Sequence, residues 1–119
     1  MASSTTIKLP TYSCALVVSV VDNVKEEANR IYKKHKIAEM LDTEAEGALL
    51  PISIKKYYLL FQKEFLSYNT IAHEVFHAAI RVTEDRDVKD EEAQAWLTGH
   101  VTAEIYKFLE KKDLQIKHG

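Results

Sequence analysis

Two histidines four residues apart, with a glutamate directly after the first, form the pattern in this chain best suited to chemistry. They are His73, Glu74 and His77, within the stretch NTIAHEVFHAAIRV (residues 69–82). Residues four apart on an α-helix lie one above the other, so both imidazoles can offer a ring nitrogen to one zinc ion about 2.0–2.1 Å away. Glu74 is turned about 100° further round the helix, where its carboxylate can accept a proton from a zinc-activated water that attacks a carbonyl carbon. Because so short a motif also arises by chance, a partly buried, metal-free histidine pair is the alternative.

A zinc ion held by two histidines needs a third protein ligand, and catalysis needs its fourth position open. The candidates are Glu91 and Glu92, which follow His77 by 14 and 15 residues in the stretch DEEAQAWLTGH. On a helical wheel Glu92 shares a side with Trp96 and His100, whereas Glu91 lies about 100° away. Acids are also favoured at the start of a helix by its dipole, so these two glutamates alone do not establish a metal site.

The stretch TIAHEVFHAA resembles the extended signature of the zincin metallopeptidases. That signature has Thr or Val three places before the first histidine, where this chain has Thr70, and uncharged residues between and after the ligands. The metzincin branch is excluded, because Ile80 and Thr83 stand where that branch has a glycine and a third histidine. The layout of residues 10–110 is also similar to small phage-encoded zincin-like proteins of unassigned role.

The segment EEAQAWL is similar to one in the prophage-repressor-cleaving and radiation-response metallopeptidases. In that family the glutamate before the alanine completes the zinc site, and this position falls on Glu92. The loop from the histidine pair to this glutamate is shorter here, and no helix-turn-helix or sensor domain is evident. The resemblance implies a Zn²⁺ cofactor bound by His73, His77 and Glu92, with Glu74 as general base.

The zincin resemblance also suggests an oxyanion-stabilising residue and a substrate-binding strand. Zincins often use a second histidine or a tyrosine to stabilise the oxyanion, and we assign this role to His100, with packing against Trp96 as the alternative. They commonly hold a peptide extended along a sheet edge, and the segment GALLPI (47–52) is the candidate edge. We therefore expect a peptide or protein substrate.

The elements that must position these residues follow from the periodicity of the apolar residues. We expect a strand over 11–21 and two short strands flanking Pro51, the second over 55–62. We expect helices over 22–36, from Thr70 to about residue 82, and over 90–111. This order predicts an α+β fold, a minimal zincin-like domain at 10–112. Its short sheet of about three strands would be covered by one N-terminal helix and two C-terminal helices that carry the metal site. Residues 1–9 and 113–119 would be tails, the first of them disordered.

Composition narrows the class of protein further. The net charge of -2 gives no reason to expect nucleic acid or an anionic membrane as partner. Cys14 is the only cysteine, and the apolar run at 14–21 is too short to span a bilayer. We therefore expect a cytoplasmic monomer, and the zincin resemblance implies that it is a zinc metallopeptidase. A zinc-binding interaction protein with little turnover is the alternative, and a metal-free interaction module is a weaker one.

Overall fold

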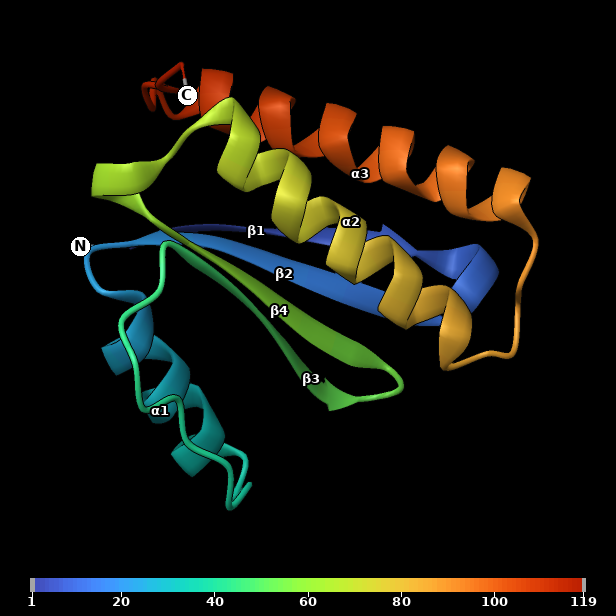
Figure 1. Ribbon diagram of the computed structural model, residues 1–119, viewed down its shortest axis with the longest axis horizontal. Coiled ribbons are helices and arrows are strands. Elements are labelled where there is room, and N and C mark those ends of the chain that lie inside the picture. Colours follow the sequence, from blue (N-terminus) through green and yellow to red (C-terminus); the bar gives the residue numbers. More distant parts are fainter. Residues whose placement is uncertain (1, 119) are drawn as a thin grey trace.

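Four strands form one mixed sheet in the order β1-β2-β4-β3 (Figure 1). The computed structural model describes residues 2–118. The strands are β1 (Ser3–Leu9), β2 (Cys14–Val21), β3 (Gly47–Ser53) and β4 (Lys56–Gln62). β2 pairs antiparallel with β1 and parallel with β4, and β3 pairs antiparallel with β4. The two most apolar strands, β2 and β4, are therefore central.

The sheet has four strands, not the three expected, because residues 3–9 form β1 where a disordered tail was expected. β1 runs in unbroken register with β2, from Ser3 opposite Val20 to Leu9 opposite Cys14. Serine and threonine suit an edge strand that has one face in solvent. Their small polar side chains made the segment resemble a tail. Met1 and Gly119, the ends of the two expected tails, lie outside the described residues.

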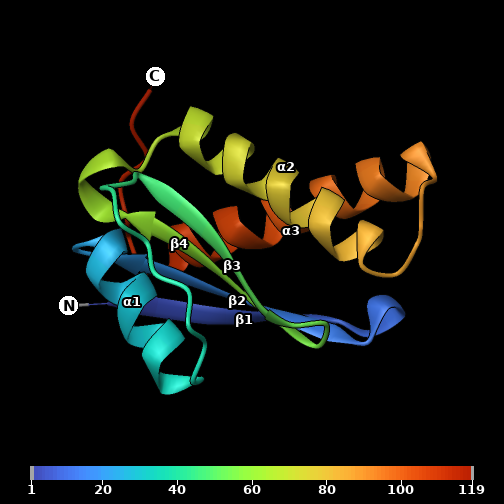
Figure 2. The ribbon, with the colours of Figure 1, turned by 60° about the horizontal axis from the view of Figure 1, so that its bottom comes forward.

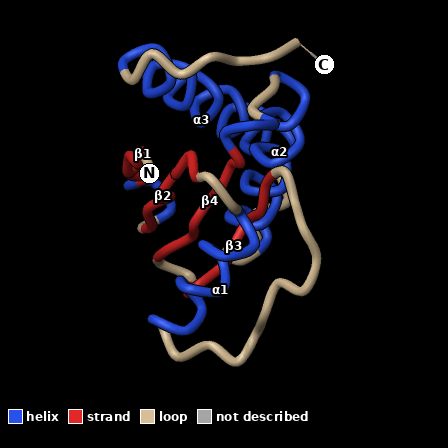
Figure 3. The backbone as a smooth tube through the Cα atoms, turned by 90° about the vertical axis from the view of Figure 1, so that its left-hand side faces the viewer, coloured by secondary structure: helices blue, strands red, loops and turns tan. Residues whose placement is uncertain are grey.

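Three α-helices cover the two faces of the sheet, as Figure 3 shows end-on. α1 (Val24–Lys34) packs on β3 and β4 from one side. On the other side, α2 (Tyr68–Glu84) lies over β3 and β4, and α3 (Glu91–Lys111) contacts β1. Two single-turn 3-10 helices, η1 (Pro10–Tyr12) and η2 (Lys63–Phe65), complete the structure. The expected α+β arrangement of one N-terminal and two C-terminal helices is confirmed. Among residues 2–118, no helix combines the length and apolar character needed to cross a membrane.

The alternation of side chains along β4 divides the core between the two helical layers. Tyr57, Leu59 and Phe61 face α2 and α3, whereas Tyr58 and Leu60 face α1, and all five are buried. Full burial of one such apolar side chain contributes roughly 1.5–3 kcal/mol. The apolar side of α2 is thereby fixed against the sheet, which decides where its polar residues point.

The start of α2 is held by a cap and by the C-terminal segment. The Ser67 hydroxyl accepts a hydrogen bond from the Thr70 amide at 3.1 Å, as an N-cap residue does. The backbone N–H of Lys117 donates a hydrogen bond to the Leu66 carbonyl, and the Lys117 carbonyl accepts a hydrogen bond from the Tyr68 amide. The expected C-terminal tail therefore lies, at Lys117, against the start of the helix that carries the histidine pair.

Candidate metal and catalytic site

The histidine pair lies on the solvent side of α2. Ile71, Val75 and Ala78 are almost fully buried against the sheet, which turns His73 and His77 outward. Their Nε2 atoms are 3.1 Å apart, and the side chain of His73 is 64 % exposed. The expected alignment of both rings on one helical face is confirmed.

The spacing of the two ring nitrogens suits a shared metal ion. Two nitrogens 3.1 Å apart, each about 2.0–2.1 Å from one zinc ion, subtend an angle of about 100° there, close to the tetrahedral value. Without an ion, the same distance allows one ring N–H to donate to the other ring nitrogen. The pair therefore fits zinc as two ligands of a tetrahedral set.

Glu74 is turned from the histidines toward β3 and is only 8 % exposed. Its Oε2 lies 3.9 Å from Nε2 of His73. Burial raises the pKa of Glu74, and the nearby His73 and His77 oppose this rise. A carboxylate with a raised pKa is a stronger base, and this one lies beside the ring nitrogens that would hold the metal.

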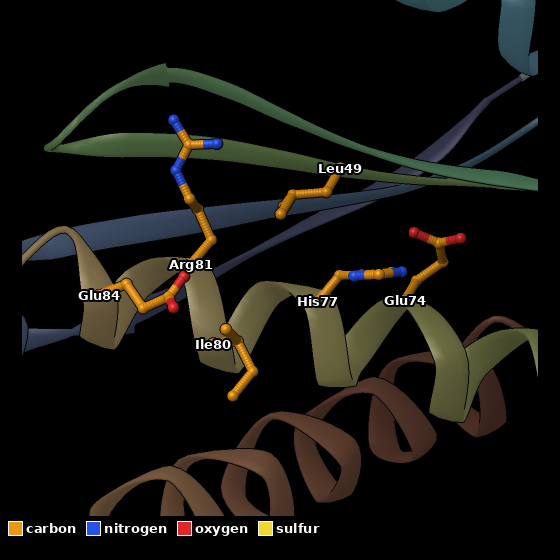
Figure 4. Close-up of a pocket in the computed structure, with 6 residues that line it drawn as sticks. All are labelled: Leu49, Glu74, His77, Ile80, Arg81 and Glu84. Carbon is orange, nitrogen blue, oxygen red and sulfur yellow. The ribbon is translucent and has the colours of Figure 1, made fainter. Parts of the chain in front are cut away.

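Strand β3 forms the opposite wall of the site, side by side with α2 (Figure 2). A cleft of about 360 Å³ lies here, lined by Leu49, Glu74, His77, Ile80, Arg81 and Glu84. Figure 4 shows Glu74 pointing from α2 toward the strand that carries Leu49, with the ring of His77 extending toward Glu74. β3 is the last strand of the sheet, so within residues 2–118 its outer edge has no partner strand. The segment GALLPI is therefore an edge strand beside the histidine helix.

Sequence reasoning did not identify the close contact between Gly47 and Glu74. A Cβ atom on Gly47 would lie 2.8 Å from Cγ of Glu74. Nearby, Thr70 donates a hydrogen bond through Oγ1 to Oε1 of Glu46 at 3.2 Å. These contacts join residues more than twenty positions apart, so no local pattern could have indicated them.

α3 runs antiparallel along the other flank of α2 (Figure 1). At one end Gln94 donates to the Thr83 hydroxyl at 3.3 Å, and at the other the rings of Tyr68 and Tyr106 are 5.9 Å apart. Thr83 is six residues beyond His77, or about 9 Å along the helix axis. The first turn of α3 therefore lies beside the C-terminal end of α2, beyond the level of His77.

The structure does not bring the expected third ligand to the pair. Glu91 and Glu92 are both exposed on the first turn of α3, where the Asp90 side chain caps the helix by accepting from the Glu92 amide. In the described part of the chain, no three His, Cys, Asp or Glu side chains are grouped so that they could hold a metal ion. The site that is assembled consists of His73, Glu74 and His77.

His100, the residue assigned to oxyanion stabilisation, is half-buried on α3. Its ring stacks on Trp96, with ring centroids 5.2 Å apart and planes 8° from parallel. The packing arrangement considered as the alternative is the one present.

Comparison with protein-family models, curated proteins and solved structures found no match. The zincin resemblance therefore rests on the sequence motifs alone.

Proposed function

We propose that the protein is a zinc-dependent peptidase in which His73 and His77 bind the metal and Glu74 is the general base. The observation that carries the proposal is the 3.1 Å separation of the two Nε2 atoms, with the buried Glu74 carboxylate 3.9 Å from one of them. A bound zinc ion supplies Lewis acidity, which polarises a carbonyl group and activates water.

Glu74 moves the protons in this scheme. Its carboxylate accepts a proton from the attacking water. The same carboxyl group, now protonated, later donates that proton to the leaving amine. Burial against β3 supports this role, because it raises the pKa of Glu74 and so makes its carboxylate a stronger base.

The substrate would lie extended along the unpaired edge of β3. Backbone N–H and C=O groups at this edge can pair with a peptide, and Leu49 and Ile80 offer apolar contacts to its side chains. Pro51 lacks an N–H, which limits pairing toward the end of the strand. A cleft of about 360 Å³ suits a few residues of an extended peptide.

The test is cleavage of a mixed peptide library by the zinc-loaded protein, with products identified by mass spectrometry. Glu74→Gln is the matched control, because it removes the base and keeps the size of the side chain. We expect zinc-dependent products from the wild type alone. The same products in both samples would overturn the proposed mechanism.

A second candidate is a zinc-binding interaction protein with little or no turnover. Two observations favour it: among residues 2–118 no third ligand is grouped with the pair, and two large apolar side chains are exposed on the same helical layer, Phe76 (59 %) and Trp96 (62 %). This candidate predicts zinc binding without cleavage of any peptide in the library.

A further inference from the structure

We propose that Gly47 is a positioning residue for Glu74, because the missing side chain at residue 47 lets the Glu74 carboxylate lie against β3. The inference rests on the proposed function, in which Glu74 is the base. It deepens that function by assigning part of the catalytic geometry to a residue on the opposite wall of the cleft.

The steric argument is direct. A Cβ atom on Gly47 would lie 2.8 Å from Cγ of Glu74 and 3.2 Å from both Cδ and Oε2. Carbon atoms in favourable contact are about 3.5–4.0 Å apart, so an added methyl group cannot coexist with the present Glu74 conformation. Gly47 has no left-handed backbone conformation and pairs regularly with Phe61. The glycine therefore supplies space, not conformational freedom.

The strand is not free to move away from an added methyl group. The Glu46 carbonyl accepts a hydrogen bond from the Gln62 amide at 2.9 Å, which holds the start of β3 to β4. The Glu46 carboxylate accepts from Oγ1 of Thr70, one helical turn before Glu74, and so holds β3 to α2. Because Glu46, the residue before Gly47, is hydrogen-bonded to both β4 and α2, the Glu74 side chain is the part that must give way.

The Gly47→Ala variant tests the catalytic consequence, with a peptide identified in the library screen as substrate. We expect kcat to fall on the order of tenfold or more, within the roughly 10²–10⁴-fold contribution of a general base. KM and zinc affinity should stay near wild-type values, because the histidines are not displaced. Gly99→Ala is the matched control, since nothing lies within 4 Å of a Cβ at that exposed helical position, and its activity should be unchanged.

A double-mutant cycle on melting temperature separates the steric contact from general damage to the fold and needs no catalysis. Gly47→Ala should lower the melting temperature of the wild type, but not that of Glu74→Ala, where the methyl group fills vacated space. Equal losses in both backgrounds, or an unchanged kcat in Gly47→Ala, would overturn the assignment of Gly47. Coupling in the cycle without any hydrolysis by the wild type would instead refute the proposed function, while supporting the contact between Gly47 and Glu74.

Discussion

The two flanks of α2 are built in different ways. Toward β3, polar atoms meet specific partners: Glu74 is buried against Gly47, and Thr70 is hydrogen-bonded to Glu46. Toward α3, the interface is mostly apolar, and both acids of the first α3 turn remain in solvent. A buried carboxylate is costly unless function or a partner retains it, so the β3 flank is where chemistry is expected. α3 then serves mainly to hold α2 on the sheet.

The largest effect should come from the base on the β3 flank. Glu74→Gln should lower the rate of peptide hydrolysis by about 10²–10⁴-fold, because an amide cannot accept the proton of the attacking water. Zinc binding and circular dichroism should remain those of the wild type, since the change removes no ligand. Undiminished hydrolysis by this variant would show that the β3 flank does not supply the base.

A stability comparison of two threonines tests whether the β3 flank is held by specific hydrogen bonds. Thr70→Val removes the bond to Glu46 and the one that the Thr70 hydroxyl accepts from Ser67, and should cost about 0.5–1.5 kcal/mol or more in the free energy of unfolding. Thr102→Val is the control on α3, where the hydroxyl donates only to the Thr98 carbonyl of its own helix at 2.7 Å. Urea denaturation should show the larger loss for Thr70→Val. Equal losses would mean that the bond to Glu46 contributes nothing specific.

The ionisation of Glu74 gives a smaller, pH-dependent effect. Burial raises the pKa of Glu74 in the folded protein, so stability is lost as pH rises from the ordinary value of a glutamate through the folded-state value. Metal-free Glu74→Gln should therefore melt at a higher temperature than the metal-free wild type at neutral pH. The melting temperatures of the two proteins should converge below about pH 4, where the Glu74 carboxyl group is protonated in both the folded and the unfolded state. A difference that does not vary with pH would argue against this cause.

The smallest effect is expected on the α3 flank. Because Glu91 and Glu92 are exposed and not grouped with the pair, Glu92→Gln and Glu91→Gln should both bind zinc within about threefold of the wild type. The sequence resemblance predicts instead that Glu92→Gln loses at least the tenfold to hundredfold typical of outer-shell changes. Parallel zinc titrations distinguish these two expectations. A large loss of zinc affinity in Glu92→Gln would mean that α3 lies elsewhere when metal is bound.

Sequence patterns predicted the elements that depend on local order. The apolar run at 14–21 is β2, the helix expected over 90–111 is α3, and the four-residue spacing aligns His73 with His77. Local patterns could not reveal β1, whose serines and threonines form a strand only because β2 pairs with them. The same applies to the contact of Gly47 with Glu74, which depends on how β3 and α2 pack.

The spacing of residues also could not fix the register between α2 and α3. A chain separation of 15 residues between His77 and Glu92 allows a tight return that would bring the two side chains together. In the structure the loop returns the chain beside the end of α2, so Gln94 donates to Thr83, six residues beyond His77, and Glu92 is exposed. Helical wheels give the side of a helix on which a residue lies, but not its level along a neighbouring helix.

Zinc titration by calorimetry, with the bound metal counted by mass spectrometry, tests the central claim most directly. The metal-free wild type should bind about one equivalent. His73→Ala and His77→Ala should each weaken binding by at least the tenfold to hundredfold seen for outer-shell changes, because each removes a ligand itself. His100→Ala, whose ring stacks on Trp96, should bind as the wild type does. Absence of zinc from the loaded wild type, or unchanged affinity after loss of either histidine of the pair, would contradict the account.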